Sequence, residues 1–397
     1  MLPKNRSPEF KFSALGRFEF SDSYIKLRNL LSMSLKGASS KMGNIKAISL
    51  FSGAGGMDLG FLRAGIEIVW ANDFEKNACE TYRKNIGDHI VCGSILDVDY
   101  KTLPDCDLVF GGPPCQGFSV AGKMDKDDPR SKLIFAFQKV VEAKHPRYFV
   151  MENVAALAKL EKFAEVRNRL FSKYREMGYN TRYMVLDSSD YDTPQKRERM
   201  ILIGTTDTYD MIQFPEKCNR KISAREALAG LDAPGTGNNQ GVCKAKITVA
   251  ASPILRKSQY AGMIFNGMGR PIDLSRPSQT LPASMGGNKT PIIDEHLLKD
   301  ENAEDWLKQW HSFIMKKEPF DAYSITVPSH LRRITVSEAA RLQGFPDEYE
   351  FFGSQCHKFK QIGNSVPPPF AYHVACAVVR SFHGDRGKEA VQMEFLF

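Results

Sequence analysis

Long hydrophobic segments are absent from this sequence, and no run approaches the roughly 20 apolar residues that a membrane-spanning helix requires. The first residues include charged side chains and no continuous apolar stretch, so we expect no secretory signal. The eight cysteines include no Cys-x-x-Cys pair of the kind found in zinc sites, and they are too sparse in 397 residues for a disulfide framework. We therefore expect a cytoplasmic protein with reduced thiols, without a membrane partner and without a metal.

Neither sign of charge dominates the composition, although 54 basic residues against 46 acidic ones leave a net charge of +8. An excess of this size is compatible with a polyanionic partner, but many basic proteins bind no nucleic acid. The length is enough for two or three domains with sizeable cores. We find no internal repeat and no low-complexity tract.

The chain divides into segments that differ in polarity, in apolar patterning and in their content of turn-forming residues. Residues 1–43 are polar and weakly patterned, which predicts a disordered N-terminal extension. From residue 44 to 205, apolar strand patterns alternate with helical ones, which indicates an α/β domain with a mostly parallel, doubly wound sheet. Residues 206–330 are rich in turn formers and predict a smaller, loop-rich inserted domain. Helical patterns return in 331–397, which we assign to the first domain.

A stiff loop follows one of the expected strands. The apolar residues 107–110 predict a buried strand, and two glycines and two prolines end it before Cys115. The prolines restrict the backbone, so Cys115 is held just beyond the end of a strand, where ligands bind in open α/β sheets. The alternative is a buried, unreactive cysteine after a turn.

A glycine-rich turn follows the first expected strand, residues 45–51. Ser52, Gly53, Ala54, Gly55 and Gly56 precede a helical pattern that starts at residue 57, an arrangement that lets backbone N–H groups face a ligand.

An acidic residue, Asp73, follows Gly53 by 20 positions, the offset at which an acid meets a ribose hydroxyl in such units. Strand, turn and spaced acid predict a nucleotide-like cofactor but do not distinguish NAD from S-adenosylmethionine.

Charged residues follow two further strands. Glu152 comes directly after the strand 148–151, and in a parallel sheet it lies at the same edge as Cys115. A carboxylate that merely favours a helix N-terminus is the alternative. Arg197 and Arg199 precede the strand 200–204, and with Gln195 they share one face of an extended segment. For them the alternative is a solvated charged strand end.

Taken together and in order, these segments resemble the DNA (cytosine-5) methyltransferases of bacterial modification systems. Six segments carry the resemblance from about residue 45 to 376: residues 50–56, 112–119, 152–154, Gln195-x-Arg197-x-Arg199, 333–346 and 363–366. The resemblance implies a Rossmann-like, S-adenosylmethionine-dependent methyltransferase sheet. It also implies a bacterial, DNA-associated protein.

The resemblance implies a reaction that explains the residue types. Carbon 5 of cytosine is too weak a nucleophile to accept a methyl group, and a thiolate added at carbon 6 activates it. Cys115 would be that thiolate, Glu152 would hold or protonate N3, Arg199 would bond O2, and Arg197 would support the loop. The cytosine must leave the base stack first.

The same resemblance places the cofactor, S-adenosylmethionine. Phe51 and the turn from Ser52 to Gly56 would hold the methionine side, Asp73 the ribose, and Phe74 the adenine. Pro113, Leu133, Asn364 and Ser365 would complete the pocket. An acid usually follows the glycine near the third strand, but here Gly93 precedes Ser94, so Ser94 replaces a stronger acceptor and Ile95 is the apolar neighbour.

Residues 206–330 correspond to the target-recognition domain of the family, which reads double-stranded DNA from the major groove. Candidate contacts to DNA are Gln195, Arg270, Arg276, Gln279, Asn288 and Lys289. We expect a monomer that is paired in function with a restriction endonuclease.

Three other functions compete with this one. A transfer-RNA cytosine-5 methyltransferase of the same fold would share the glycine-rich and Pro-Pro-Cys motifs, but the residues 116–119 and the long insert favour DNA. A catalytically silent DNA-binding relative is disfavoured by intact Cys115, Glu152, Arg197 and Arg199. An NAD-dependent oxidoreductase would leave the residues 112–119 and 363–366 without a role.

Overall fold

The computed structural model describes residues 44–114, 132–316 and 325–384. These residues belong to a unit that starts at Gly43. The expected N-terminal extension, residues 1–43, and the expected nucleophile, Cys115, lie outside the described residues.

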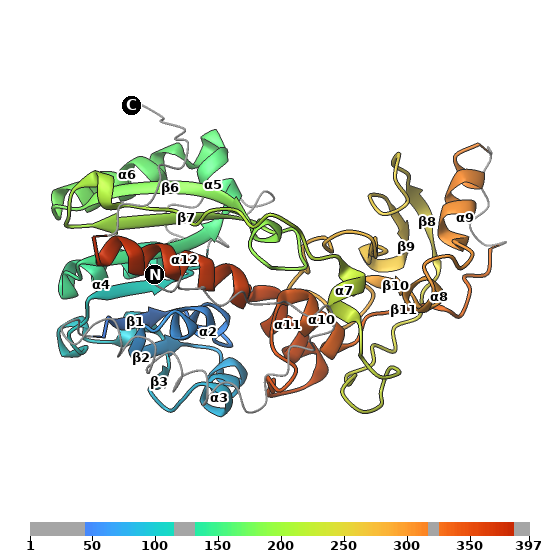
Figure 1. Cartoon of the computed structure of the whole chain (residues 1–397), viewed down its shortest axis with the longest axis horizontal. Helices are drawn as coiled ribbons and strands as arrows, with labels where there is room; N and C mark the ends of the chain where they lie inside the picture. Colours follow the sequence, from blue (N-terminus) through green and yellow to red (C-terminus); the bar gives the residue numbers. More distant parts are fainter. Residues whose placement is uncertain (1–43, 115–131, 317–324, 385–397) are drawn as a thin grey trace, which may run out of the picture. The chain divides into compact units, whose positions relative to one another are not determined.

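A seven-stranded sheet forms the centre of the first part of the described chain (Figure 1). Its strand order is β3-β2-β1-β4-β5-β7-β6, and β1 to β5 run parallel, whereas β7 is antiparallel to both of its neighbours. The strands are β1 (Lys46–Leu50), β2 (Glu67–Asp73), β3 (Ile90–Cys92), β4 (Leu108–Gly111), β5 (Tyr148–Val154), β6 (Asn180–Asp187) and β7 (Glu198–Thr205). The predicted mostly parallel α/β sheet is confirmed.

Alternation of buried side chains along each strand builds one core on each face of the sheet. On β5, Tyr148 and Val150 belong to one core, and Phe149 and Met151 to the other. Because both faces are covered, these strands are apolar throughout, as parallel strands usually are.

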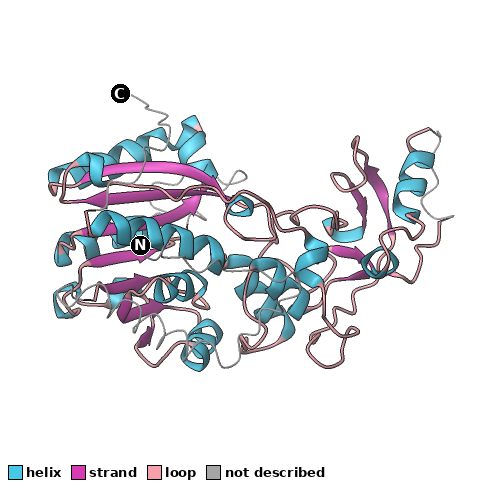
Figure 2. Ribbon diagram, viewed as in Figure 1, coloured by secondary structure: helices cyan, strands magenta, loops and turns pink. Residues whose placement is uncertain are grey.

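Helices cover both faces (Figure 2). α2 (Gly56–Arg63), α3 (Lys76–Asn85) and α12 (Pro368–Phe382) contribute to the first core, while α4 (Lys132–Lys144), α5 (Ala155–Lys159) and α6 (Ala164–Glu176) contribute to the second. α2 and α12 approach so closely at Gly60 that a Cβ there would lie 2.5 Å from the backbone nitrogen of Tyr372. The last helix of the chain is therefore part of the first domain's core.

The strand order reverses at β1, which lies between β2 and β4. In open α/β sheets, ligands bind outside the carboxyl ends of the strands at such a reversal. The glycine-rich turn follows β1, and the segment that leads to Cys115 follows β4, so the fold places both predicted motifs at this point.

Short elements make up most of the segment after β7. They are α7 (Ala224–Leu228), β8 (Val249–Ile254), β9 (Met263–Phe265), β10 (Ile292–Asp294), α8 (Glu295–Lys299) and α9 (Trp306–Ile314), followed by β11 (Leu331–Arg333), α10 (Val336–Gln343) and α11 (Gln355–Asn364). β11 pairs with β10, and a third core joins Ala224 and Ile293 to Phe345 and Ile362. The proposed domain boundary at residue 330 thus falls between elements that pack together.

None of the helices among the described residues is long and apolar enough to cross a membrane.

Candidate active site

The glycine-rich turn after β1 has an unusual backbone. Phe51, Gly53 and Gly55 all have positive φ values, of 55°, 56° and 81°. Gly55 caps α2, and a Cβ there would lie 2.2 Å from Ile86, so glycine is required by both conformation and space. A Cβ on Gly53, by contrast, would meet no atom of the described residues within 4 Å. The turn therefore leaves room beside Gly53.

Gly56, the first residue of α2, makes the turn's other close approach. A Cβ there would lie 2.4 Å from the carbonyl oxygen of Val366 and 3.0 Å from the Cβ of Ser365. Ser365 is buried, and its hydroxyl donates to the carbonyl of Gln361 over 2.7 Å. The predicted cofactor residue Ser365 therefore lies against the turn, while the preceding Asn364 is exposed at the end of α11.

Asp73 ties the turn to the end of β2. Its carboxylate accepts hydrogen bonds of 2.8 Å from the backbone N–H of Gly53 and of Glu75. Burial raises the pKa of Asp73 above its ordinary value. The next side chain, Phe74, is 67% exposed, although it is a large aromatic residue beside a buried acid. An exposed ring in this position offers a stacking surface for a flat ligand.

Other predicted cofactor residues are engaged with the protein. The hydroxyl of Ser94 accepts from the backbone N–H of Leu96 over 3.2 Å and caps a short 3-10 helix, Ile95–Asp97. Ile95 itself is 2% exposed and packs in the second core, as the half-buried Leu133 does at the start of α4. In the structure Ser94 therefore caps a helical turn and Ile95 packs in the core, and the contact of either residue with a cofactor stays a prediction.

A carboxylate and two guanidinium groups meet between β5 and β7. The Nε of Arg199 lies 2.8 Å from the Oε1 of Glu152, and both side chains are largely buried. Because β5 and β7 are antiparallel neighbours in which Glu152 pairs with Ile201, the two side chains come from adjacent positions at one sheet edge. Glu152 and Arg199, both predicted from the sequence to be catalytic, thus lie in contact, and their catalytic roles stay a prediction.

Arg197 lies behind this pair. Burial and the neighbouring Arg199 lower the pKa of Arg197 to about 9, and Glu152 opposes the shift. Its Nε has no hydrogen-bond partner among the described residues. A buried cation of this kind stabilises negative charge next to it.

The segment that leads to Cys115 runs alongside Glu152. A Cβ on Gly112 would lie 3.0 Å from the Oε2 of Glu152. The buried Asn153 donates to the carbonyl of Pro113 over 3.0 Å and so fixes the segment two residues before Cys115. This role of Asn153 was not predicted from the sequence, although the residue stands inside the motif 152–154.

Gln195 was predicted to contact DNA, but its side chain is buried inside the protein. Its side chain is 0% exposed, donates to Gln343 over 2.5 Å and accepts from the backbone N–H of Leu281 over 3.2 Å. Since both ends of the amide are satisfied inside the protein, Gln195 connects the arginine segment to α10 and to the insert, and it is not a surface contact for DNA.

A basic cleft of about 750 Å³ opens beside Arg199. Four basic side chains and one acidic side chain line it, together with polar and methionine side chains from the insert. The lining residues are Ala155, Lys196, Glu198, Arg199, Met263, Met268, Arg270, Gln279, Thr280, Pro282, Ser284, Lys289 and Pro291. A cleft with this charge favours a phosphate backbone beside Arg199.

Three of the predicted DNA contacts, Arg270, Gln279 and Lys289, line this cleft, whereas Arg276 does not. Arg276 is exposed and lies 3.6 Å from Asp273. Asn288 is exposed, and its carbonyl accepts from the backbone N–H of Gly269. Lys196 was not among the predicted contacts, although its position between Gln195 and Arg197 places it on the opposite, outward face of the same extended segment.

Comparisons with known proteins agree with this geometry. The family profile described as C-5 cytosine-specific DNA methylase matches residues 45–380. The Type II methyltransferase M.NgoFVII of Neisseria gonorrhoeae is 32% identical over 368 residues, covering 89% of this chain and 91% of that protein. M.MthTI of Methanothermobacter thermautotrophicus, also a Type II methyltransferase, is 31% identical and covers 86% of this chain and 99% of that protein.

Among solved structures, the methyltransferase EhMeth of Entamoeba histolytica superimposes with a TM-score of 0.59 at 16% identity, covering 87% of this chain and 100% of that one. At this identity the match supports the fold alone. The family profile spans the glycine-rich turn, the Glu152–Arg199 pair and the return segment with α12. The chain therefore belongs to the C-5 cytosine-specific DNA methylase family and is a DNA cytosine-5 methyltransferase.

Proposed function

We propose that this enzyme methylates carbon 5 of a cytosine flipped out of a specific double-stranded DNA sequence, with S-adenosylmethionine as the methyl donor. The observation that carries the proposal is the ion pair between Glu152 and Arg199, which lies beside the segment leading to Cys115 and opens into the basic cleft. A carboxyl and a guanidinium at one sheet edge, beside the segment that leads to the thiol of Cys115, match the groups of a cytosine that must be held and activated.

The turn after β1 fits the proposed donor. Space beside Gly53, the carboxylate of Asp73 at the end of β2 and the exposed ring of Phe74 form a cradle for a nucleoside with an attached chain. In this arrangement Asp73 would accept from the ribose hydroxyls, Phe74 would stack on the adenine, and Ser365 would close the side next to Gly56. S-adenosylmethionine supplies an electrophilic methyl group when it is bound.

The proposed role of Cys115 follows from the weakness of carbon 5 as a nucleophile. The thiolate adds to carbon 6, and the ring's electrons are then available at carbon 5. After methylation, loss of the carbon 5 proton to a base re-forms the ring double bond and releases the thiolate. The base that takes this proton is not among the residues we assign.

Glu152 and Arg199 act on the opposite edge of the same ring. Glu152 bonds or protonates N3, which withdraws electrons while the thiolate adds, and Arg199 donates to O2. Their mutual ion pair of 2.8 Å holds both groups in place before a base arrives. Arg197, buried behind them, supports the negative charge that develops.

We assign the recognition of DNA to residues 206–330, with residues 44–205 and 331–397 as the catalytic domain. Arg270, Gln279 and Lys289 come from this insert and face the cleft, which supports the assignment. Lys196 and Arg199 come from the catalytic side of the same cleft. A duplex in the cleft would thus contact both parts, and we expect a monomer to be sufficient for this.

The relatives M.NgoFVII and M.MthTI bear the name Type II methyltransferase. By this similarity we propose that the enzyme is the modification partner of a restriction endonuclease in a bacterial cytoplasm. The proposal concerns function in the cell and requires no physical complex with the endonuclease.

The test is to incubate the purified chain and S-adenosylmethionine with unmethylated genomic DNA and to map 5-methylcytosine by bisulfite sequencing. We expect methylation at one short sequence motif. A parallel reaction with bulk transfer RNA is the control for substrate class. Methylation of the RNA without methylation of DNA would overturn the proposal.

A further inference from the structure

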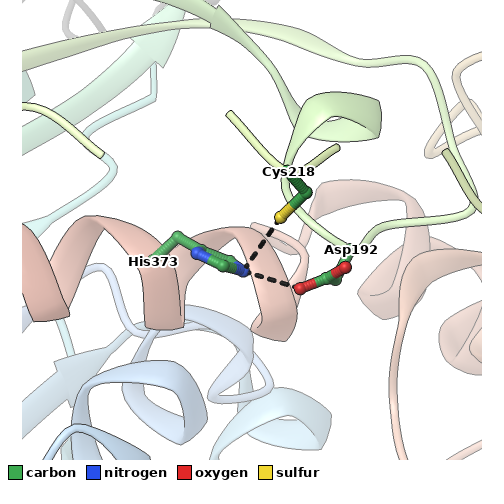
Figure 3. A group of neighbouring side chains, drawn as sticks. All are labelled: Asp192, Cys218 and His373. Carbon is green, nitrogen blue, oxygen red and sulfur yellow. Dashed lines mark hydrogen bonds and ion pairs between the residues drawn. The ribbon is translucent and has the colours of Figure 1, made fainter. Parts of the chain in front are cut away.

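Three side chains with metal-binding atoms meet on the side of the sheet where α12 lies (Figure 3). They are Asp192, between β6 and β7, Cys218, in the segment after β7, and His373, in α12. One ligand atom from each lies within 4.8 Å of the other two. This cluster contains none of the proposed catalytic or cofactor residues, and the reaction gives it no role.

The local structure fixes the positions of these groups. The backbone N–H of Cys218 donates to the carbonyl of Asp190 over 2.8 Å, which joins the segment of Cys218 to the turn of Asp192. Asp192 has a φ of 51°, which is uncommon outside glycine and turns its carboxylate toward α12. The ring of His373 packs against the buried ring of Tyr191 with centroids 5.8 Å apart.

The distances suit a tetrahedral ion. The Nε2 of His373 lies 3.7 Å from the Sγ of Cys218, and usual zinc–nitrogen and zinc–sulfur bonds at a tetrahedral angle put these atoms about 3.5 Å apart. The same Nε2 lies 2.8 Å from the Oδ2 of Asp192, a hydrogen bond that a bound ion would open to about 3.3 Å. A shift of about half an ångström in an exposed aspartate is within the reach of its side chain.

From this geometry we infer that Asp192, Cys218 and His373 bind one zinc ion, with water as the fourth ligand. Sulfur, imidazole nitrogen and carboxylate oxygen in one cluster are the donor set of zinc, and a three-residue site leaves one position open. The Asp192 side chain is 51% exposed, so an ion and a water can reach the site from solvent. This inference does not depend on the proposed methylation chemistry.

Proton balance makes the binding depend on pH. Zinc binds cysteine as the thiolate and histidine through an unprotonated nitrogen, so protons compete with the ion. Zinc takes the place of the thiol proton and of the proton between His373 and Asp192, so at least one proton is released. Lys217 and Lys221 form ion pairs with Asp190, which offsets their positive charge near the site. We expect affinity to fall as the pH is lowered.

Occupancy would tie the start of the segment 206–330, which carries Cys218, to two parts of the catalytic domain. Asp192 stands five residues before the buried Arg197, and α12 packs on α2, the helix after the glycine-rich turn. A metal bound by these three residues would stabilise the folded chain, because the unfolded chain does not hold them together.

Cobalt provides the most direct test, because Co²⁺ occupies zinc sites and absorbs visible light in a tetrahedral field. The full-length chain is freed of metal with a chelator and titrated with Co²⁺, and then with Zn²⁺ as competitor. We expect one equivalent of Co²⁺ with thiolate charge-transfer and tetrahedral d–d bands, both abolished by Zn²⁺. We also expect Zn²⁺ to raise the Tm of the wild-type chain.

Two variants and a control locate the site. Cys218→Ser and His373→Gln should each weaken Co²⁺ binding at least tenfold, remove the charge-transfer band in the case of Cys218→Ser, and remove the zinc-dependent rise in Tm. Cys376→Ser, three residues beyond His373 on the same helix, should bind like the wild type. Circular dichroism checks that each variant is folded. Unchanged binding in both ligand variants, or no binding by the wild type, would overturn the inference.

Discussion

At the scale of single residues, Glu152 and Arg199 bind each other in the free enzyme and are proposed to bind a cytosine during the reaction. Before a base arrives, the two side chains satisfy each other over 2.8 Å in a largely buried setting. With a cytosine between them, each must exchange part of this bond for a contact to the ring. A carboxyl that can donate or share a proton is needed only in the second state.

Replacing Glu152 by glutamine therefore separates its contact with Arg199 from its function as an acid. Glu152→Gln keeps the shape and a hydrogen bond to Arg199 but loses the acid, so we expect kcat to fall by about 10²- to 10⁴-fold. Donor binding, measured by calorimetry, should remain within about threefold of wild type. Glu198→Gln, an exposed carboxylate in the same cleft, is the control and should keep most activity. Activity of Glu152→Gln close to that of the wild type would contradict the assignment.

A second buried acid, Asp58 in α2, makes a prediction about pH. Burial raises the pKa of Asp58 from 3.8 to about 7, and the hydroxyl of Tyr82 donates to it over 2.9 Å. The folded chain therefore holds a proton that the unfolded chain has lost between about pH 4 and pH 7. In this window the stability contributed by Asp58 falls as the pH rises.

Asp58→Asn should remove this loss because its amide does not ionise. The variant should therefore gain stability relative to the wild type as the pH rises. Its free energy of unfolding minus that of the wild type should be larger at pH 8 than at pH 5, by up to a few kcal/mol. Urea denaturation at the two pH values measures the difference, and Asp88→Asn, an exposed carboxylate, should show none. Parallel pH profiles for Asp58→Asn and the wild type would argue against a protonated Asp58.

At the scale of elements, the contact between α2 and α12 depends on a missing side chain. A Cβ on Gly60 would lie 2.5 Å from the backbone of Tyr372 and 2.6 Å from the Cβ of Ala371, so it has no flexible group to displace. Gly60→Ala should destabilise the fold by about 1–3 kcal/mol through overpacking, despite the better helix propensity of alanine.

The matched control is Gly287→Ala, because a Cβ at Gly287 meets no described atom within 4 Å and its φ is ordinary. Thermal denaturation of both variants tests the contact. If Gly60→Ala were as stable as Gly287→Ala, the close packing of α2 on α12 would be wrong.

The elements that the sequence predicts well are those with a strong local signal. The strands β1, β4 and β5 carry buried apolar side chains on both faces, which is required where helices cover a sheet on both sides. Their order in the sheet follows the usual alternation of strand and helix. The antiparallel direction of β7 carries no local signal, because the same residues would pack equally well in a parallel strand.

Contacts between segments that are far apart in the chain could not be predicted from local sequence patterns. Gln195 has the same polar character as a surface residue, and only its partners Gln343 and Leu281, about 150 and 86 positions away, make it a buried connector. Ser94 resembles a ligand acceptor, but the helical turn that it caps takes its hydroxyl. Helix α11 was not expected, since its glycine at position 363 weakens the helical pattern and is needed for contact with Ala283.

At the scale of the whole molecule, the basic cleft predicts how DNA binding responds to salt. Each phosphate contact contributes about 0.9 to the slope of log affinity against log salt concentration. The double variant Arg270→Ala/Lys289→Ala removes two cleft cations and should lower this slope by up to about 2 and weaken binding at low salt. Arg276→Ala, outside the cleft, should leave the slope unchanged. Equal slopes for the two variants would place the duplex elsewhere.

The catalytic and recognition parts of the molecule share a strand pair and a core. β10 and β11 pair across residue 330, and the third core contains residues from both proposed domains. We therefore expect the two parts to unfold together in a single transition, because separating them would divide the third core. The recognition segment is then a set of loops supported by the catalytic core's return segment.

The central claim is that the thiol of Cys115 adds to a cytosine held by Glu152 and Arg199. Duplex DNA carrying 5-fluorocytosine at the methylated position tests it, because fluorine cannot leave as a proton does and the adduct is trapped. With S-adenosylmethionine present, we predict an SDS-stable complex of enzyme and DNA that forms with the wild type and is missing with Cys115→Ala, although Cys115→Ala still binds the donor. A stable complex with Cys115→Ala, or none with an active wild type, would contradict the account.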